Sequence, residues 1–162
     1  MVSADNYISR DPARLYHKKG KPDPSTMFSV GCVFIDHASG YGSIKHQVDI
    51  KATETVKETL TFDREDQSQG VVIKGYHTDN GIVNASEFMD ELLKNQQKIR
   101  FSGAGASYQN GAAERAIKTV VTMARTMLMH AAPRCPEDTL YTDLWPTTMD
   151  YNILVYNRTP DM

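Results

Sequence analysis

Two carboxylates, one after a strand and one at the start of a helix, constrain the fold of this chain most strongly. Residues 71 to 76 (Val-Val-Ile-Lys-Gly-Tyr) form a short apolar run, and the turn sequence Asp-Asn-Gly follows at 79 to 81. This pattern predicts that Asp79 lies exposed at the C-terminal tip of a strand, where open α/β sheets hold their sites. Glu114 lies in the first turn of the strongest helical pattern, Gly111 to His130. Two carboxylates placed in this way can share divalent metal.

Both local sequences resemble motifs of retroviral-type integrases and transposases. Residues 77 to 81 (His-Thr-Asp-Asn-Gly) resemble the string around the second acid of the Asp-Asp-Glu triad, and residues 110 to 115 (Asn-Gly-Ala-Ala-Glu-Arg) resemble the start of the helix that carries the third acid. The second string is closest to the integrases of copia-type LTR retrotransposons. Residues 157 to 160 (Asn-Arg-Thr-Pro) resemble the string that closes their catalytic core. The spacing of the two acids is one residue shorter than the spacing for which the family is named, and a loop deletion would explain this.

The resemblance implies a fold, a site and an activity. The implied fold is α/β and RNase H-like, a mixed five-stranded sheet flanked by helices in the order βββαβαβαα. The implied activity is metal-dependent polynucleotidyl transfer, which joins the 3′ ends of retrotransposon cDNA to target DNA. Its catalytic residues and metal ligands would be Asp5, Asp79 and Glu114, with two Mg²⁺ (or Mn²⁺) ions in the active complex. The DNA-binding residues implied beside this site are Lys118, Arg115, Gln109, Asn110 and Arg125.

Hydrophobic periodicity along the chain predicts the same order of elements. A long loop rich in proline and basic residues is expected from Arg10 to Thr26. Strands are expected at Val2 to Ile8, Phe28 to Ile35, Tyr41 to Ile50, Val71 to Tyr76 and Lys98 to Ser102. Helices are expected at Ala52 to Gln67, on the outside of the fold, and at Ala85 to Gln97, Gly111 to His130 and Glu137 to Tyr156.

Length and composition favour one domain, spanning residues 1 to 162. Because only four residues precede Asp5, this domain is expected to be a fragment of a longer polyprotein. The hydrophobic content of 40% is enough for a sizeable core. Two cysteines far apart in sequence predict neither a disulfide framework nor a zinc site, which fits a reduced intracellular setting. No apolar run reaches membrane-spanning length, so a soluble protein without a membrane partner is expected. The resemblance also implies a homodimer or higher multimer that pairs through the last two helices. It further implies that the parent element is located in the nucleus and the virus-like particle.

Charge is the one feature that conflicts with a DNA partner, because the formal net charge is −2. The charges are segregated, however. Residues 10 to 21 have five basic side chains and one acidic side chain, and residues 98 to 134 have six basic side chains and Glu114 alone. These basic blocks flank the candidate site, although ordinary solvated faces would give the same pattern.

The first acid of the triad is assigned by counting strands. In the implied fold the first acid lies on the first, central strand, and three strands precede the first helix. Counting Asp36 as that acid leaves one strand too few, whereas counting Asp5 gives all three. Residues 2 to 5 (Val-Ser-Ala-Asp) also resemble the first strand of copia-type relatives. We therefore expect the carboxylates of Asp5, Asp79 and Glu114 to converge within reach of shared metal, and Asp36 to occupy a hairpin turn.

Each candidate also has a structural interpretation. Asp79 is a common turn residue, and Glu114 is an acid favoured by the dipole at a helix N-terminus. Lys118 either grips a phosphate or forms an i,i+4 ion pair with Glu114, and Asn110 is also a simple turn residue. The alternative functions are a catalytically inactive DNA-binding or assembly module derived from an integrase, and an RNase H-like nuclease.

Overall fold

The computed structural model of the chain describes residues 1–17, 23–79, 86–103, 110–134 and 143–159. The expected order βββαβαβαα is confirmed. The strands are β1 (Val2–Ala13), β2 (Phe28–Asp36), β3 (Gly42–Gln47), β4 (Gly75–Thr78) and β5 (Lys98–Phe101). The helices are α1 (Ala52–Ser68), α2 (Ser86–Lys94), α3 (Gly111–Ala131) and α4 (Trp145–Tyr156), with short 3-10 helices η1 (Pro24–Thr26) and η3 (Ala132–Arg134).

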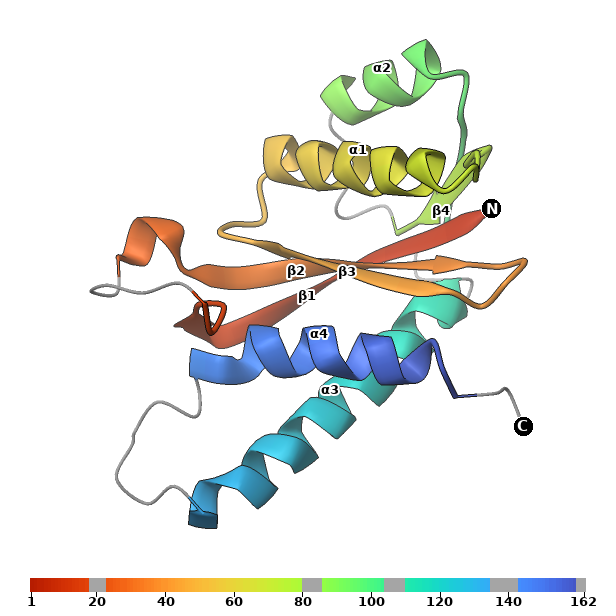
Figure 1. Cartoon of the computed structure of the whole chain (residues 1–162). Helices are drawn as coiled ribbons and strands as arrows, with labels where there is room; N and C mark the ends of the chain where they lie inside the picture. Colours follow the sequence, from red (N-terminus) through yellow and green to blue (C-terminus); the bar gives the residue numbers. More distant parts are fainter. Residues whose placement is uncertain (18–22, 80–85, 104–109, 135–142, 160–162) are drawn as a thin grey trace.

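The strands form one mixed sheet in the order β3-β2-β1-β4-β5. The central strand β1 is antiparallel to β2 on one side and parallel to β4 on the other. Helices α1 and α2 cover one face of the sheet, and α3 and α4 cover the opposite face (Figure 1). No helix in the described parts of the chain is both long and apolar enough to cross a bilayer.

Alternation along β1 and β2 divides the core between the two faces of the sheet. Ala4 pairs with Phe34, and both belong to the core under α1 and α2, where the Phe34 ring stacks on Phe62 at 4.6 Å between centroids. The next pair along is Asp5 and Val33, and Val33 belongs to the core under α3 and α4. Because successive residues of a strand point to opposite faces, Asp5 faces α3 and α4.

The first strand is longer than its sequence pattern predicts. We expected it to end at Ile8 and a loop to begin at Arg10, but β1 continues to Ala13, which pairs with Phe28 of β2 after a shift in register. The pairing of Ala13 with Phe28, which local sequence does not reveal, extends the strand beyond the irregular stretch after Ile8. This correction moves Arg10 from the expected loop onto the central strand.

The fourth strand also differs from its prediction. The apolar run 71 to 76 suggested a strand there, but Val71 and Val72 are 51% and 69% exposed and precede β4. β4 begins at Gly75, where a Cβ atom would lie 2.6 Å from the carbonyl oxygen of Lys98. Close pairing with β5 therefore requires glycine at this position, and the strand ends at Thr78, directly before Asp79.

Two helices also depart from their predictions. α1 is not simply an outer helix, because its residues Thr55, Thr59, Phe62 and Asp63 are buried. The final helix, expected from Glu137, begins at Trp145 in the described part of the chain, where Pro146 is favourable in a first turn. The expected start of that helix, like the small-residue loop near 105, lies outside the described residues.

Candidate active site

Asp5 and Asp79 occupy neighbouring positions on adjacent parallel strands. Ala4 of β1 pairs with Thr78 at the end of β4, so Asp5 and Asp79 each come next along their strands. Adjacent strands lie about 4.8 Å apart. Both side chains are partly buried. The pairing register therefore brings two carboxylates that are far apart in sequence to the same end of β4, where it lies beside β1.

Glu114 lies near the same place because the start of α3 is hydrogen-bonded to β1. The amide of Asn110, directly before α3, donates a 3.0 Å hydrogen bond from Nδ2 to the carbonyl oxygen of Ala4. Asn110 is only 1% exposed. Glu114 follows one helical turn later and is partly buried. This one contact fixes the N-terminus of α3 beside Asp5.

Electrostatics show that the three carboxylates interact. The pKa of Asp5 is raised from 3.8 to about 6, first by burial and then by the negative charges of Glu114 and Asp79, while a hydrogen bond from the Asn6 amide opposes the rise. Like charges that raise a neighbour's pKa lie close to it. The carboxylates of Glu114 and Asp79 therefore lie near that of Asp5.

Convergence of the three carboxylates on shared metal stays a prediction. We expected the three carboxylates to lie within reach of shared metal, but no group of three His, Cys, Asp or Glu side chains among the described residues is close enough to hold an ion. Mutual repulsion of like charges opposes such convergence. The donor set nevertheless fits Mg²⁺, which prefers carboxylate oxygens and retains several waters.

The raised pKa of Asp5 predicts a pH-dependent stability in the absence of metal. Between 3.8, the ordinary value, and about 6, the folded state holds a proton that the unfolded state releases, so stability falls as pH rises through this window. Below this pH window Asp5 is protonated in both states and does not lower the free energy of unfolding. Above the window Asp5 is ionised in both states, and its burial lowers the free energy of unfolding by the full amount. Melting curves with chelator should therefore show Asp5→Asn more stable than the wild type at pH 7, with the difference shrinking at pH 4. A difference independent of pH would contradict this.

Asp36 is separate from the other acids and occupies the turn expected for it. Its Oδ2 accepts hydrogen bonds from the backbone amides of Ala38 and Ser39, at 3.2 and 2.9 Å, and from the Ser39 hydroxyl at 2.8 Å. Burial alone would raise its pKa, but these bonds and the N-terminal ammonium together lower it. Asp36 pairs with Val2, three positions along β1 from Asp5.

The residues implied for DNA binding fall into three groups. Lys118, Arg115 and Arg125 are exposed on α3. Gln109 lies outside the described residues. Asn110 is buried and its amide holds Ala4, so it is not presented to DNA as the resemblance implied.

The spacing of Lys118 from Glu114 allowed either a phosphate contact or an i,i+4 ion pair with Glu114. Although both residues are described, they form no ion pair within the part of the chain that the structure describes. The exposed ammonium therefore remains available to an anion.

Sequence patterns missed a partly buried set of hydrogen-bonded polar side chains behind the site. The Tyr7 hydroxyl lies 2.7 Å from Nδ1 of His46, and Nε2 of His46 lies 2.8 Å from Asp150. Burial and the charge of Asp150 raise the pKa of Tyr7 well above its usual range. This set joins β1, β3 and α4, and its only sequence signal was the strand pattern that places Tyr7 on the same face as Asp5.

The sheet order, the helices on both faces and the acid on the central strand define the RNase H-like fold of integrase catalytic cores. Neither a family model nor a curated protein matches the sequence. Solved structures do match the fold. The HTLV-2 integrase catalytic core domain in complex with magnesium, in its dimeric form, has a TM-score of 0.62 and 16% identity over 99% of this chain and 88% of that chain.

Two further structures have the same likeness. The catalytic core domain of BIV integrase has a TM-score of 0.63 and 13% identity, covering 99% of this chain and 85% of that chain. A chain of the simian T-cell lymphotropic virus intasome in complex with PP2A regulatory subunit B56 gamma has a TM-score of 0.65 and 15% identity, covering 99% of this chain and 49% of that chain. This chain thus spans about half the length of the simian viral chain. At these identities the likeness shows the fold alone.

Proposed function

We propose that this chain is the catalytic core of an integrase from a copia-type LTR retrotransposon, a domain of a longer polyprotein that joins cDNA 3′ ends to target DNA. The observation that carries the proposal is geometric: Asp5 and Asp79 directly follow the paired residues Ala4 and Thr78 on adjacent parallel strands of an integrase-like sheet, and Asn110, at the start of the helix that carries Glu114, is hydrogen-bonded to Ala4. Support for the copia-type origin comes from the motif strings at 110 to 115 and 157 to 160. The parent element would act in the nucleus and the virus-like particle.

The three carboxylates are the proposed catalytic residues and metal ligands. Two Mg²⁺ or Mn²⁺ ions held by them would supply an activated attacking oxygen and a stabilised leaving oxygen. Asp5 must lose its proton to serve as a ligand, so its raised pKa makes metal binding sensitive to pH. Asn110 acts as a positioning residue, since its bond to Ala4 keeps Glu114 beside Asp5.

A strand-transfer assay tests this function. Full-length parent protein, labelled duplex DNA with a free 3′-hydroxyl and a supercoiled target are incubated with Mg²⁺ or Mn²⁺. The proposal requires metal-dependent covalent joining of the labelled end to the target. Cutting without joining would show water as the nucleophile and support a nuclease, and DNA binding without any chemistry would support an inactive module.

Weak, salt-dependent DNA binding is expected of the core alone, because few basic residues flank the site. Lys118→Ala should weaken binding and reduce the slope of log affinity against log salt by about 1, since the variant neutralises one phosphate fewer. Fluorescence anisotropy with duplex DNA at several salt concentrations measures both quantities.

The matched control for Lys118 is Lys57→Ala. Lys57 is an exposed lysine on α1, which covers the opposite face of the sheet, and its substitution should leave the slope unchanged. Metal-dependent thermal stabilisation should survive in both variants. Loss of the fold in Lys118→Ala, or equal slopes in both variants, would contradict a phosphate contact.

Self-association is also proposed, through α3 and α4. Tyr151 and Leu154 of α4 are 52% and 47% exposed, which leaves apolar surface uncovered in the single chain. The HTLV-2 core domain, similar in fold, has been solved in dimeric and trimeric forms. A homodimer or higher multimer would bury this surface.

A further inference from the structure

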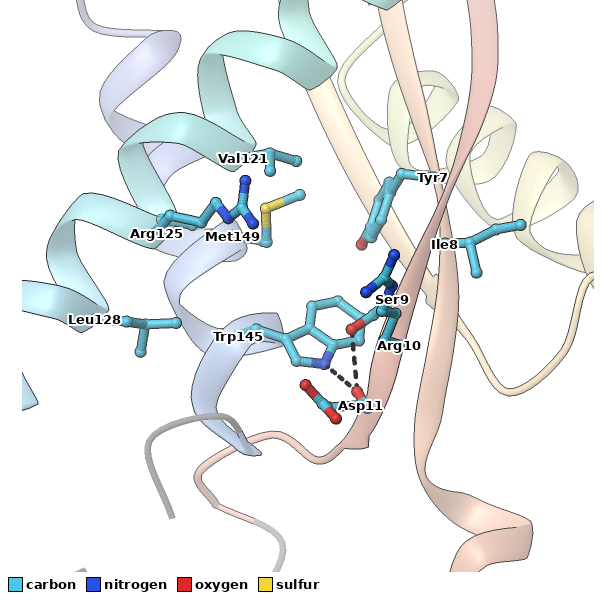
Figure 2. A pocket seen from close by; sticks show the side chains of 11 residues that line it. Tyr7, Ile8, Ser9, Arg10, Asp11, Val121, Arg125, Leu128, Trp145 and Met149 are labelled. Carbon is cyan, nitrogen blue, oxygen red and sulfur yellow. Dashed lines mark hydrogen bonds between the residues drawn. The ribbon is translucent and has the colours of Figure 1, made fainter. Parts of the chain in front are cut away.

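A cavity lies away from the three carboxylates, where the far half of β1 meets α3 and α4 (Figure 2). Its volume is about 560 Å³, within the range of ligand sites in proteins. Apolar side chains of Val121, Leu128, Trp145 and Met149 form one part of its wall. Two arginines form another part.

The arginines reach this cavity from different elements. Arg10 extends from β1 and Arg125 from α3, with both guanidinium groups toward the cavity (Figure 2). Both side chains are exposed, and neither forms an ion pair with any other described residue. Asp11 is the one acidic residue among the described residues of the lining, so the net charge there is positive. Planar guanidinium groups with free donors suit a phosphate.

The aromatic wall is held rigidly. The indole Nε1 of Trp145 donates a 2.8 Å hydrogen bond to the backbone oxygen of Asp11. Edge-to-face contacts with Tyr7 and His46, at 5.9 and 5.5 Å between centroids, fix the ring further. A fixed aromatic wall beside arginines is the combination that binds a nucleotide, with apolar contact for the base and positive charge for the phosphate.

The cavity is aligned with the carboxylates along two elements. On α3, Glu114, Lys118 and Arg125 fall within about 40° of one another, and Arg125 lies roughly 16 Å along the axis from Glu114. On β1, Arg10 lies about 16 Å from Asp5. β1 and α3 point in the same direction. Asn110 is hydrogen-bonded to Ala4 near the start of both elements, and Arg10 and Arg125 line the cavity further along them.

This alignment sets the reach of a bound strand. A separation of about 16 Å corresponds to about five base steps of duplex DNA, and to fewer steps of an extended single strand. A strand at the carboxylates would therefore reach the arginines within a few nucleotides, and it would pass Lys118 on the way.

We propose that this cavity binds one unpaired nucleotide of the DNA strand that passes the carboxylates. Its base contacts Trp145 and the neighbouring apolar wall, and its phosphate lies between Arg10 and Arg125. The choice of DNA as the ligand rests on the proposed function, whereas the site itself rests on the side chains that line it.

Trp145 is the single tryptophan of the chain, so its emission reports directly on the cavity. Short single-stranded oligothymidylate, titrated without divalent metal, should quench this emission in a saturable way. Arg10→Ala combined with Arg125→Ala should weaken the quenching at least about tenfold and lower the salt slope by about 0.7, because the variant no longer neutralises the bound phosphate. Arg64→Ala, at an exposed arginine on α1, is the matched control and should change neither quantity.

Four results would overturn the proposal. The first two are binding of the oligonucleotide without a change in Trp145 emission, and equal quenching by blunt duplex DNA. The third is displacement of the oligonucleotide by oligoglutamate, which then causes the same quenching. The fourth is wild-type quenching by a folded double arginine variant. The test is separable from the proposed function. Glu114→Gln should abolish strand transfer and leave the quenching intact, so failure of strand transfer alone leaves the nucleotide site standing.

Discussion

Asp5→Asn should reduce metal-dependent strand transfer by at least about a hundredfold while the protein remains folded. The substitution removes a carboxylate ligand from the metal site, and losses of this size follow when one group that stabilises reacting charge is removed. The variant should melt no lower than the wild type at pH 7, because it also removes a carboxylate that burial, Glu114 and Asp79 disfavour. Initial rates of covalent joining, with melting curves of the same preparations, measure both effects.

The matched control for Asp5 is Asp36→Asn. Asp36 accepts hydrogen bonds from Ala38 and Ser39 in its turn, so its substitution should lower stability and leave most of the activity. The reverse pattern, with Asp36→Asn inactive and Asp5→Asn active, would overturn the assignment of the first acid.

Gly31→Ala should cause a large loss of stability, although it adds only one methyl group to the sheet. A Cβ atom at Gly31 would lie 2.2 Å from the Tyr7 hydroxyl oxygen and 2.3 Å from its Cζ atom. Tyr7 cannot easily move, because its hydroxyl contacts His46, which in turn contacts Asp150. Overpacking costs about 1–3 kcal/mol, and loss of a buried hydrogen bond adds to it. Urea denaturation should give a free energy of unfolding lower by about 3 kcal/mol.

Two further variants test the cause of that destabilisation. Gly111→Ala is the control, since the added methyl group would meet only the flexible end of Arg115, at 3.1 Å, and should be tolerated. In a Tyr7→Ala background, Gly31→Ala should cost much less, because the clashing ring is gone. An unchanged stability of Gly31→Ala, or an equal cost in both backgrounds, would show that the tyrosine does not lie across Gly31 as described.

Features set by local sequence were predictable, and features set by distant contacts were not. The helical stripe predicted α3 within one residue of its end, because Ala113, Ala116, Val120 and Ala124 face the core at helical spacing. The turn sequence after Thr78 placed Asp79 at a strand end for the same local reason. By contrast, the length of β1 depends on pairing with β2, and the role of Asn110 depends on a carbonyl 106 residues away.

The candidate acids illustrate the same limit. Strand counting placed Asp5 on the central strand and Asp36 in a turn, as the structure has them. Strand counting cannot give the separation of the carboxylates, because that depends on repulsion, burial and side-chain rotation. Their convergence on one metal site therefore stays a prediction. Arg10 was likewise assigned to a loop, so its position in the same cavity as Arg125 could not be predicted.

Asp5, Asp79 and Glu114 are proposed to form one divalent metal site. Anomalous diffraction from crystals of this chain grown with Mn²⁺ tests it most directly, because the ion is located without reference to activity. We predict an anomalous peak bounded by carboxylate oxygens of all three residues, absent from crystals of Asp79→Asn. A peak at another acidic group such as Asp63 and Asp66, or ordered carboxylates with no peak at saturating Mn²⁺, would show that these three residues do not form a metal site.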